Sequence, residues 1–203
     1  ATHAHSAPAG GMSESEAQRV LRVAREGGIG LVDTSSAYGH SEERIGRHPE
    51  PLLVATKFGN PSPLNKHTQD YSCEHCAASL RQSLQAVGHQ RIACLQLHSP
   101  PEHPSPLHAN DGELVRMLEH YKADGAIGGW GASVHSVNGG QVALRAGADM
   151  LQVPFSCLQQ ENLPLLVMCN LRRTGVLCQS ALCQGWLTET GGGLGSTMRQ
   201  PPQ

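Results

Sequence analysis

Three short apolar runs in this 203-residue chain each end on an ionisable side chain. The runs end at Asp33, Lys57 and His98, and Tyr38 follows the first run by five residues. Continuous apolar runs of this length are typical of parallel strands that are buried on both faces. In a β/α barrel the C-terminal ends of successive strands converge on one mouth. We therefore expect the three side chains to face a common pocket, with Tyr38 on the loop beside them.

The segments between the apolar runs have helical patterns, so strands and helices alternate along the chain. Ser13 and Glu16 form a capping-box pattern at the start of the first helix, and Asp111 is the expected cap of the fourth. Hairpin signals are absent, which favours a parallel sheet. We expect helices over residues 13–26, 41–46, 72–87, 111–121, 136–146 and 163–171, and strands over 29–33, 52–57, 92–98, 126–131, 150–153 and 176–179.

Six expected strands are two fewer than a closed β/α barrel contains. The fold class we expect is therefore α/β, an incomplete barrel of about six parallel strands. By length, residues 1–190 form one domain. Residues 191–203 are rich in Gly, Pro, Ser and Gln and are expected to form a disordered tail.

Composition excludes several classes of function. A formal charge of −2 and an isoelectric point near 6.7 provide no basic surface for nucleic acid. No apolar run approaches the ~20 residues that a membrane span needs, and residues 1–12 lack the apolar core of a signal peptide. We therefore expect a cytoplasmic protein that binds neither nucleic acid nor membrane.

The seven cysteines are expected to be free thiols, because the chain has no signal of export. Cys73 and Cys76 have the CxxC spacing, with His75 between them. No second pair stands at the spacing of a zinc site. We therefore assign no metal site.

The order of the motifs resembles that of the aldo-keto reductases from about Glu14 to Thr188. The likeness covers what would be the second to seventh strands of that family's barrel. Nothing before Ser13 resembles the family's first strand, and nothing after Thr188 resembles its eighth strand with the Arg-containing 2′-phosphate site. The motifs that carry the resemblance are Gly28–Thr34 with Tyr38, Gly39 and Ser41–Glu43, Ala55–Gly59, Ser79–Leu84, Leu95–Ser99, Gly125–Gly128, Gly131–Ser133, Gln152–Phe155, Gly175–Leu177 and Ser180–Thr188.

The resemblance implies an NADPH-dependent reduction of a small aldehyde or ketone. Asp33, Tyr38, Lys57 and His98 match the family's catalytic tetrad. The implied cofactor residues are Ser133 and Gln152 at the nicotinamide amide, and Gln179, Ser180, Leu182 and Gln184 along the seventh strand and the pyrophosphate loop. The family's usual Ser-Asn pair is Ser133-Val134 here, and Gln179 stands where an aromatic residue often stacks on the nicotinamide ring.

Carbonyl reduction needs a hydride at carbon and a proton at oxygen. Tyr38 is the expected general acid, although a phenol with a pKa near ~10 must be tuned for this role. A lysine ammonium close to the phenol lowers that pKa, so we expect Lys57 to tune Tyr38 and Asp33 to hold Lys57. His98 would orient the substrate carbonyl or share the proton.

Two alternatives stay open. The same tetrad could catalyse cofactor-independent isomerisation, dehydration or cyclisation if the NADPH site has been lost, which Val134 and Gln179 favour. A non-catalytic, truncated homologue is the other alternative. An open six-stranded sheet would have two unpaired edges, and these could pair two copies of the chain as a homo-oligomer.

Overall fold

The computed structural model describes residues 12–49, 52–61 and 68–187. Six parallel strands form one sheet in chain order. The strands are β1 Leu31–Asp33, β2 Leu53–Phe58, β3 Cys94–His98, β4 Trp130–Ser133, β5 Met150–Pro154 and β6 Gly175–Gln179.

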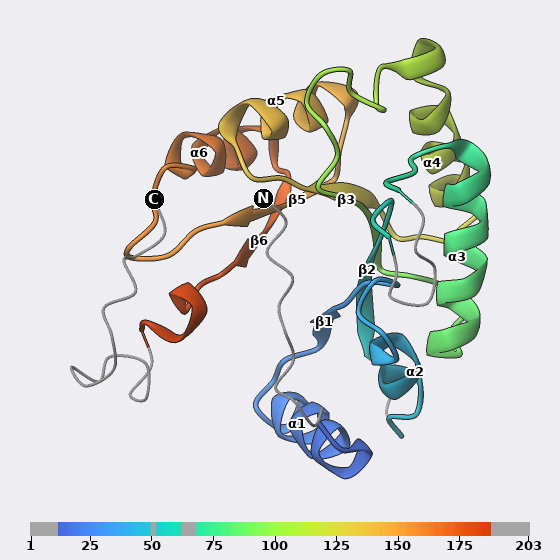
Figure 1. Cartoon of the computed structure of the whole chain (residues 1–203), viewed down its shortest axis with the longest axis vertical. Helices are drawn as coiled ribbons and strands as arrows, with labels where there is room; N and C mark the ends of the chain where they lie inside the picture. Colours follow the sequence, from blue (N-terminus) through green and yellow to red (C-terminus); the bar gives the residue numbers. More distant parts are fainter. Residues whose placement is uncertain (1–11, 50–51, 62–67, 188–203) are drawn as a thin grey trace.

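Helices alternate with the strands and lie along the outer side of the sheet (Figure 1). The α-helices are α1 Glu14–Glu26, α2 Ser41–Gly46, α3 Cys73–Val87, α4 Glu113–Ala123, α5 Val137–Ala146 and α6 Leu163–Arg172, and the 3₁₀ helices are η1 Ala109–Gly112 and η2 Cys183–Gly185.

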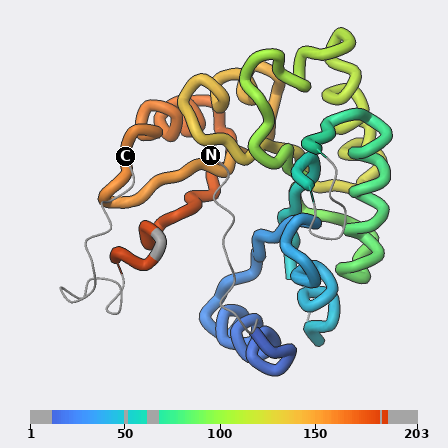
Figure 2. The backbone as a smooth tube through the Cα atoms, viewed as in Figure 1, coloured from blue at the N-terminus to red at the C-terminus, as the bar shows by residue number. Residues whose placement is uncertain are grey.

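The sheet curls into a half-barrel, as the backbone tube makes clear (Figure 2). The strands β1 and β6 are the two edges of the sheet, and they do not pair with each other. The expected incomplete barrel with six parallel strands is therefore confirmed. Pairing of two copies through the edges of β1 and β6 stays a prediction, and the expected tail at 191–203 lies outside the described residues.

The strand expected at 126–131 is placed wrongly. β4 begins only at Trp130, and before it Ile127 forms an isolated bridge with Ile92. The carboxylate of Asp149 occupies the space beside Gly129, where a Cβ would lie 3.0 Å from its Oδ2, and that oxygen also accepts the Trp130 N–H. On the side of β5 a side chain thus takes the place of strand pairing at this point, and regular pairing with β5 starts one residue later, at Gly131.

The start of the fourth helix is also wrong, because Asp111 does not cap it. Asp111 and Gly112 have left-handed backbone angles, with φ of 53° and 76°. Left-handed residues cannot continue a right-handed helix, so α4 begins at Glu113. The capping box of the first helix is confirmed, since the Ser13 hydroxyl accepts from the Glu16 N–H and the Glu16 carboxylate accepts from the Ser13 N–H.

The hydrophobic core lies between the sheet and the helices. Its largest member is Trp130, whose ring is buried and whose Nε1 donates to Glu119 at 2.6 Å. The side chains packed there from the strands and helices include Val54, Leu95, Leu97, Leu118, Leu151 and Leu165. All seven cysteines are free thiols, as expected.

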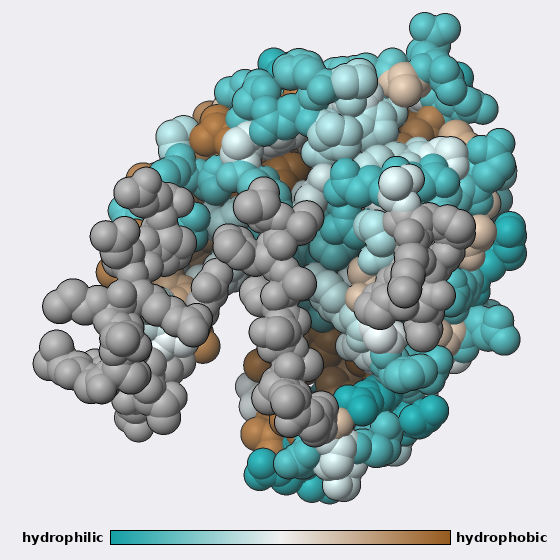
Figure 3. Space-filling view, in the orientation of Figure 1, coloured by the Kyte–Doolittle hydropathy of each residue, from teal (hydrophilic) through white to brown (hydrophobic). Residues whose placement is uncertain are grey.

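One helix exposes an apolar stripe. Leu163, Val167 and Leu171 recur at four-residue spacing along α6, and all three are exposed. This spacing puts them on one face of the helix. Elsewhere on the face drawn in Figure 3, hydrophobic residues form separate patches on a mostly hydrophilic surface.

The close approach of β4 and β5 depends on Gly131, where a Cβ would lie 2.1 Å from the Met150 carbonyl oxygen. We expect Gly131→Ala to lower the free energy of unfolding by about 3 kcal/mol, because the backbone must shift to admit the methyl group. Gly30→Ala is the matched control, since its Cβ would have only an ordinary contact at 3.6 Å. Urea unfolding of both variants measures the difference, and equal stabilities would contradict the proposed packing.

Candidate active site

The four tetrad residues lie at the C-terminal end of the first three strands. Asp33 is the last residue of β1, Lys57 is the penultimate residue of β2, and His98 is the last residue of β3. Tyr38 lies on the loop between β1 and α2. Because the strands are parallel and adjacent, their ends bring these residues to one edge of the sheet.

An ion pair joins the buried ammonium of Lys57 to the partly exposed carboxylate of Asp33. The Lys57 ammonium donates to Asp33 Oδ2 at 2.6 Å and to the Thr34 carbonyl at 3.0 Å, and only 1% of the lysine side chain is exposed. Burial lowers the pKa of Lys57, while the charge of Asp33 and its hydrogen bond act in the opposite direction. A buried ammonium is strongly destabilising without such a partner, so this contact is the electrostatic centre of the site.

Two amides complete the surroundings of Asp33. Gln96 Nε2 donates to Asp33 Oδ1 at 3.2 Å, and Gln152 Nε2 donates to Asp33 Oδ2 at 3.0 Å. Gln152 belongs to β5, which is separated from β1 by three intervening strands. The side chain of Gln152 reaches Asp33 only because the sheet curls. The Asp33 carboxylate therefore connects β1 with β5 across the half-barrel.

Tyr38 lies over this ion pair. Lys57 Nζ is 5.3 Å from the centre of its ring, and the ring meets that of His98 edge to face at a centroid distance of 5.7 Å. Partial burial raises the pKa of Tyr38 above 10.0, and the negative charge of Asp33 raises it further. The expected lowering of this pKa by Lys57 is therefore not found. The ammonium is paired with Asp33, so its charge is largely compensated at the phenol.

His98 is held from two sides. Its Nδ1 lies 3.2 Å from the Ser35 hydroxyl, and its backbone carbonyl accepts from the Tyr71 hydroxyl at 2.7 Å. Burial lowers the pKa of His98 to about 4, with smaller contributions from the charges of Lys57 and His135. The imidazole is therefore neutral at neutral pH and can donate or accept one hydrogen bond at each nitrogen.

The loop that carries Tyr38 is anchored at both ends. Thr34 Oγ1 donates to Ser41 Oγ at 3.0 Å, and Ser36 Oγ donates to the Lys57 carbonyl at 3.3 Å. Next along the chain, buried Glu42 accepts from Thr56 at 2.6 Å and from Ser83 at 2.7 Å. These hydrogen bonds connect α2 to β2 and α3. The loop that carries the Tyr38 phenol is therefore fixed in place at its C-terminal end.

Sequence reasoning missed Ser35, Gln96 and Glu42 as parts of this site. Gln96 could have been found from strand alternation, because it lies two residues before His98 and so shares its face of the sheet. Glu42 belongs to the Ser41–Glu43 motif, but the sequence does not indicate its contacts with β2 and α3. No sequence signal connects Ser35 with His98, which is 63 positions away.

The residues expected at the nicotinamide amide lie next to the tetrad. Ser133 ends β4, where it is paired with His98 on one side and with Gln152 on the other. Gln152 Oε1 is buried and has no hydrogen-bond partner within the described residues. An unpaired buried acceptor is costly, and the amide N–H of a nicotinamide would satisfy it. Ser133 and Gln152 therefore fit this part of the cofactor.

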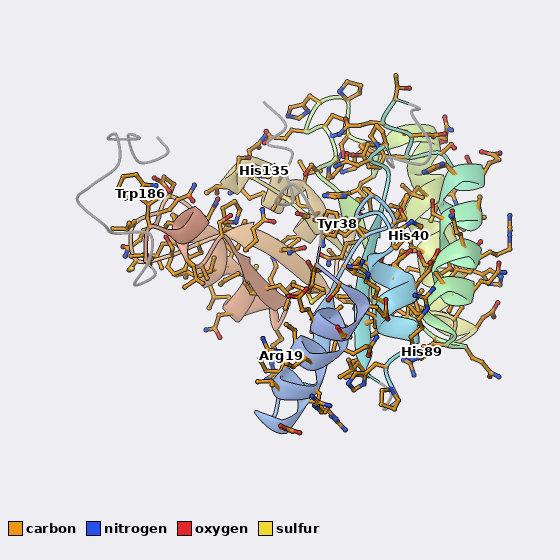
Figure 4. All side chains as sticks on the ribbon, turned by 60° about the horizontal axis from the view of Figure 1, so that its bottom comes forward. Arg19, Tyr38, His40, His89, His135 and Trp186 are labelled. Atoms are coloured by element: carbon orange, nitrogen blue, oxygen red, sulfur yellow. The ribbon has the colours of Figure 1, made fainter. Side chains whose placement is uncertain are left out.

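The residues expected along the rest of the cofactor follow β6. Gln179 is its last residue, Ser180 has a left-handed φ of 57°, and Leu182 is exposed. Gln184 lies in η2, and its side chain is outside the described part of the structure. Figure 4 shows Trp186, which ends this loop, far from Tyr38 and His135. These expected cofactor residues thus follow β6, and their role stays a prediction.

His135 and the loop after β3 form the rim of the site. The Ser99 hydroxyl lies 3.0 Å from His135 Nε2. Glu102 bonds to Ser136 and, at 2.7 Å, to Asn138 at the start of α5. The segment 99–110 is thus attached to the α5 side of the mouth.

A family model for the aldo/keto reductases matches residues 2–201. The chain belongs to the aldo/keto reductase family. Among curated proteins it is 26% identical over 210 residues to a D-threo-aldose 1-dehydrogenase from a Pseudomonas species, covering 88% of this chain and 63% of that protein. The chain thus spans under two thirds of the length of this relative.

Solved aldo/keto reductase structures share the fold. A Pseudomonas aeruginosa protein described as an aldo-keto reductase has a TM-score of 0.76 at 29% identity, covering 91% of this chain and 71% of its own. The glycerol dehydrogenase of Gluconobacter oxydans has a TM-score of 0.73 at 27% identity, with coverage of 94% and 60%. The half-barrel therefore corresponds to part of the barrel of these proteins.

Two further observations concern the described residues alone. None of their helices combines the length and apolar character needed to cross a membrane. No group of three or more His, Cys, Asp or Glu side chains among them is arranged to hold a metal ion.

His98 makes stability depend on pH in a defined window. Its pKa is about 4 in the folded chain and 6.5 in the reference state, so the unfolded chain binds the proton first as the pH falls. Stability from this residue is therefore lost between pH 6.5 and 4, by at most roughly 3 kcal/mol. We expect His98→Asn to lose less stability than the wild type over this range in urea unfolding. The other histidines are present in both proteins, so parallel pH curves would contradict the assignment.

Proposed function

We propose that this aldo/keto reductase is an oxidoreductase that reduces small aldehydes or ketones with NADPH, using Tyr38 as the general acid. The observation that supports the proposal most is the position of Tyr38. The centre of its ring lies 5.3 Å from Lys57 Nζ, and this ammonium is paired with Asp33. Neutral His98 lies at the edge of the same phenol ring. A proton donor, a buried cation and a neutral hydrogen-bonding group are thus gathered at one strand edge.

The bound nicotinamide would supply a hydride to the carbonyl carbon. Tyr38 then gives its hydroxyl proton to the carbonyl oxygen, which completes the alcohol. The raised pKa of Tyr38 keeps the phenol protonated before this transfer. The transfer leaves a phenolate, which takes a proton from water before the next turnover because its pKa is raised.

Ser133 and Gln152 would hold the nicotinamide amide, with the unpaired Gln152 Oε1 as the acceptor. Gln179, Ser180, Leu182 and Gln184 would follow the remainder of NADPH. Val134 has no polar group to offer the amide, so Gln152 carries more of the recognition here. Its bond to Asp33 uses Nε2, which leaves Oε1 available.

The similar proteins suggest the first substrates to test. The names of two of them, D-threo-aldose 1-dehydrogenase and glycerol dehydrogenase, indicate sugars and polyols. The polar strand-end residues Asp33, Gln96 and Gln152 are compatible with hydroxylated substrates. A panel of small hydroxyaldehydes beside an apolar aldehyde therefore tests the substrate class.

A second function is cofactor-independent acid–base catalysis by the same tetrad. It is favoured by Val134, an apolar residue in the place of a second polar partner for the nicotinamide amide. In this case the residues that would otherwise hold NADPH would bind substrate instead.

Replacing Tyr38 separates the two functions. We expect the full chain to bind NADPH, followed by tryptophan fluorescence, and Tyr38→Phe to lower kcat by about 10²- to 10⁴-fold with little change in the Kd for NADPH. Tyr121→Phe, on the outer helix α4, is the matched control and should retain activity.

Two results would overturn the reductase proposal. One is the absence of NADPH binding at millimolar cofactor, and the other is unchanged reduction by Tyr38→Phe. Turnover without any cofactor that disappears in Tyr38→Phe would establish the second function instead.

A further inference from the structure

Ser35 is a buried hydroxyl placed between the tyrosine loop and His98. Only 1% of its surface is exposed. Its Oγ lies 3.2 Å from His98 Nδ1 and accepts a hydrogen bond from the Ala37 N–H at 3.1 Å. The hydroxyl oxygen therefore has two partners within the described residues, and one of them is already a donor.

The hydrogen-bond inventory distinguishes the two neutral forms of His98. If Nδ1 carried the proton, the Ser35 oxygen would accept from both Nδ1 and Ala37, and its own hydrogen would have no acceptor among the described residues. A buried donor left unpaired in this way is destabilising. If Ser35 donates to Nδ1, its oxygen and hydrogen and the ring nitrogen are all satisfied, and the proton of the imidazole resides on Nε2.

We propose that Ser35 is a positioning residue that holds His98 as the Nε2–H tautomer. The tautomer is fixed by which nitrogen accepts the serine hydrogen, since the other must then carry the ring proton. Other contacts place the ring without selecting its proton. Tyr71 binds the His98 backbone carbonyl, and Tyr38 meets the ring edge to face.

The consequence for catalysis rests on the proposed function. Nε2 has no protein partner within the described residues, so its N–H is available to a carbonyl oxygen of the substrate. His98 would then donate a hydrogen bond to the oxygen that receives the Tyr38 proton. In the opposite tautomer, the lone pair of Nε2 would face the same oxygen and repel it.

The tautomer can be measured without any assumption about activity. In ¹⁵N NMR spectra of the imidazole rings, the unprotonated nitrogen resonates far downfield of the protonated one. Comparison with His98→Asn identifies the signals of His98 among the twelve histidines. At neutral pH we expect Nδ1 of the wild type to have the downfield shift. A downfield Nε2 would overturn the proposal, whether or not the protein reduces carbonyls.

Variants of the two neighbouring serines test the role of Ser35. We expect Ser35→Ala to move the Nδ1 and Nε2 shifts toward each other, because both tautomers become populated, and Ser35→Thr to restore the wild-type pattern. Ser36→Ala is the matched control, since the Ser36 hydroxyl bonds to the Lys57 carbonyl, and it should leave the His98 shifts unchanged. Unchanged shifts in Ser35→Ala would overturn the proposal.

The kinetic readout is separate. If the chain reduces carbonyls as proposed, Ser35→Ala should lower kcat/KM about tenfold, as expected for loss of one hydrogen bond that orients a catalytic group, and Ser35→Thr should recover most of it. Failure of the reductase proposal would remove this readout and leave the NMR result intact. Wild-type kcat/KM in Ser35→Ala of an active enzyme would contradict the catalytic consequence.

Discussion

The contact between the buried Lys57 ammonium and the Asp33 carboxylate is the interaction on which the rest of the site depends. An ammonium with 1% of its side chain exposed remains in the interior because a carboxylate lies 2.6 Å away. The same carboxylate accepts bonds from Gln96 and Gln152. Through this single group, β1, β2, β3 and β5 are connected at the C-terminal edge of the sheet. The curl of the sheet brings Gln152 to this carboxylate, so the site depends both on the ion pair and on the shape of the half-barrel.

The pair also determines the state of its neighbours. Burial raises the pKa of the Tyr38 phenol, and the negative charge of Asp33, the partner of Lys57, raises it further. His98, buried near the lysine, remains neutral. Before any reaction, the site thus contains a protonated phenol, a neutral imidazole and a compensated ion pair. This combination is compatible with the proposed role of Tyr38, which keeps its proton until a substrate oxygen beside it accepts that proton.

Much of the fold could be predicted because parallel strands and amphipathic helices have strong local patterns. Continuous apolar runs located the strand ends at Asp33 and His98, and the number of strands followed from counting such runs. Gly128 and Gly129 weakened the prediction of β4, since glycines have no pattern of burial and the nearby Asp149 carboxylate replaces a strand contact. The tetrad could be found from its motifs, whereas its pKa values could not. The pKa values depend first on how deeply each group is buried and then on the charges beside it, and both follow only from the folded sheet. The bond from Ser35 to His98 likewise joins residues that only the folded sheet brings together.

Titration of Tyr38 tests the central role of the ion pair most directly. The ultraviolet difference spectrum between wild type and Tyr38→Phe reports the appearance of one phenolate as the pH rises. The account predicts a midpoint above the ordinary value of 10.0, because burial of the phenol and then the negative charge of Asp33 both raise its pKa. A midpoint below that value would contradict it, since the phenol would then experience an ammonium that Asp33 does not neutralise.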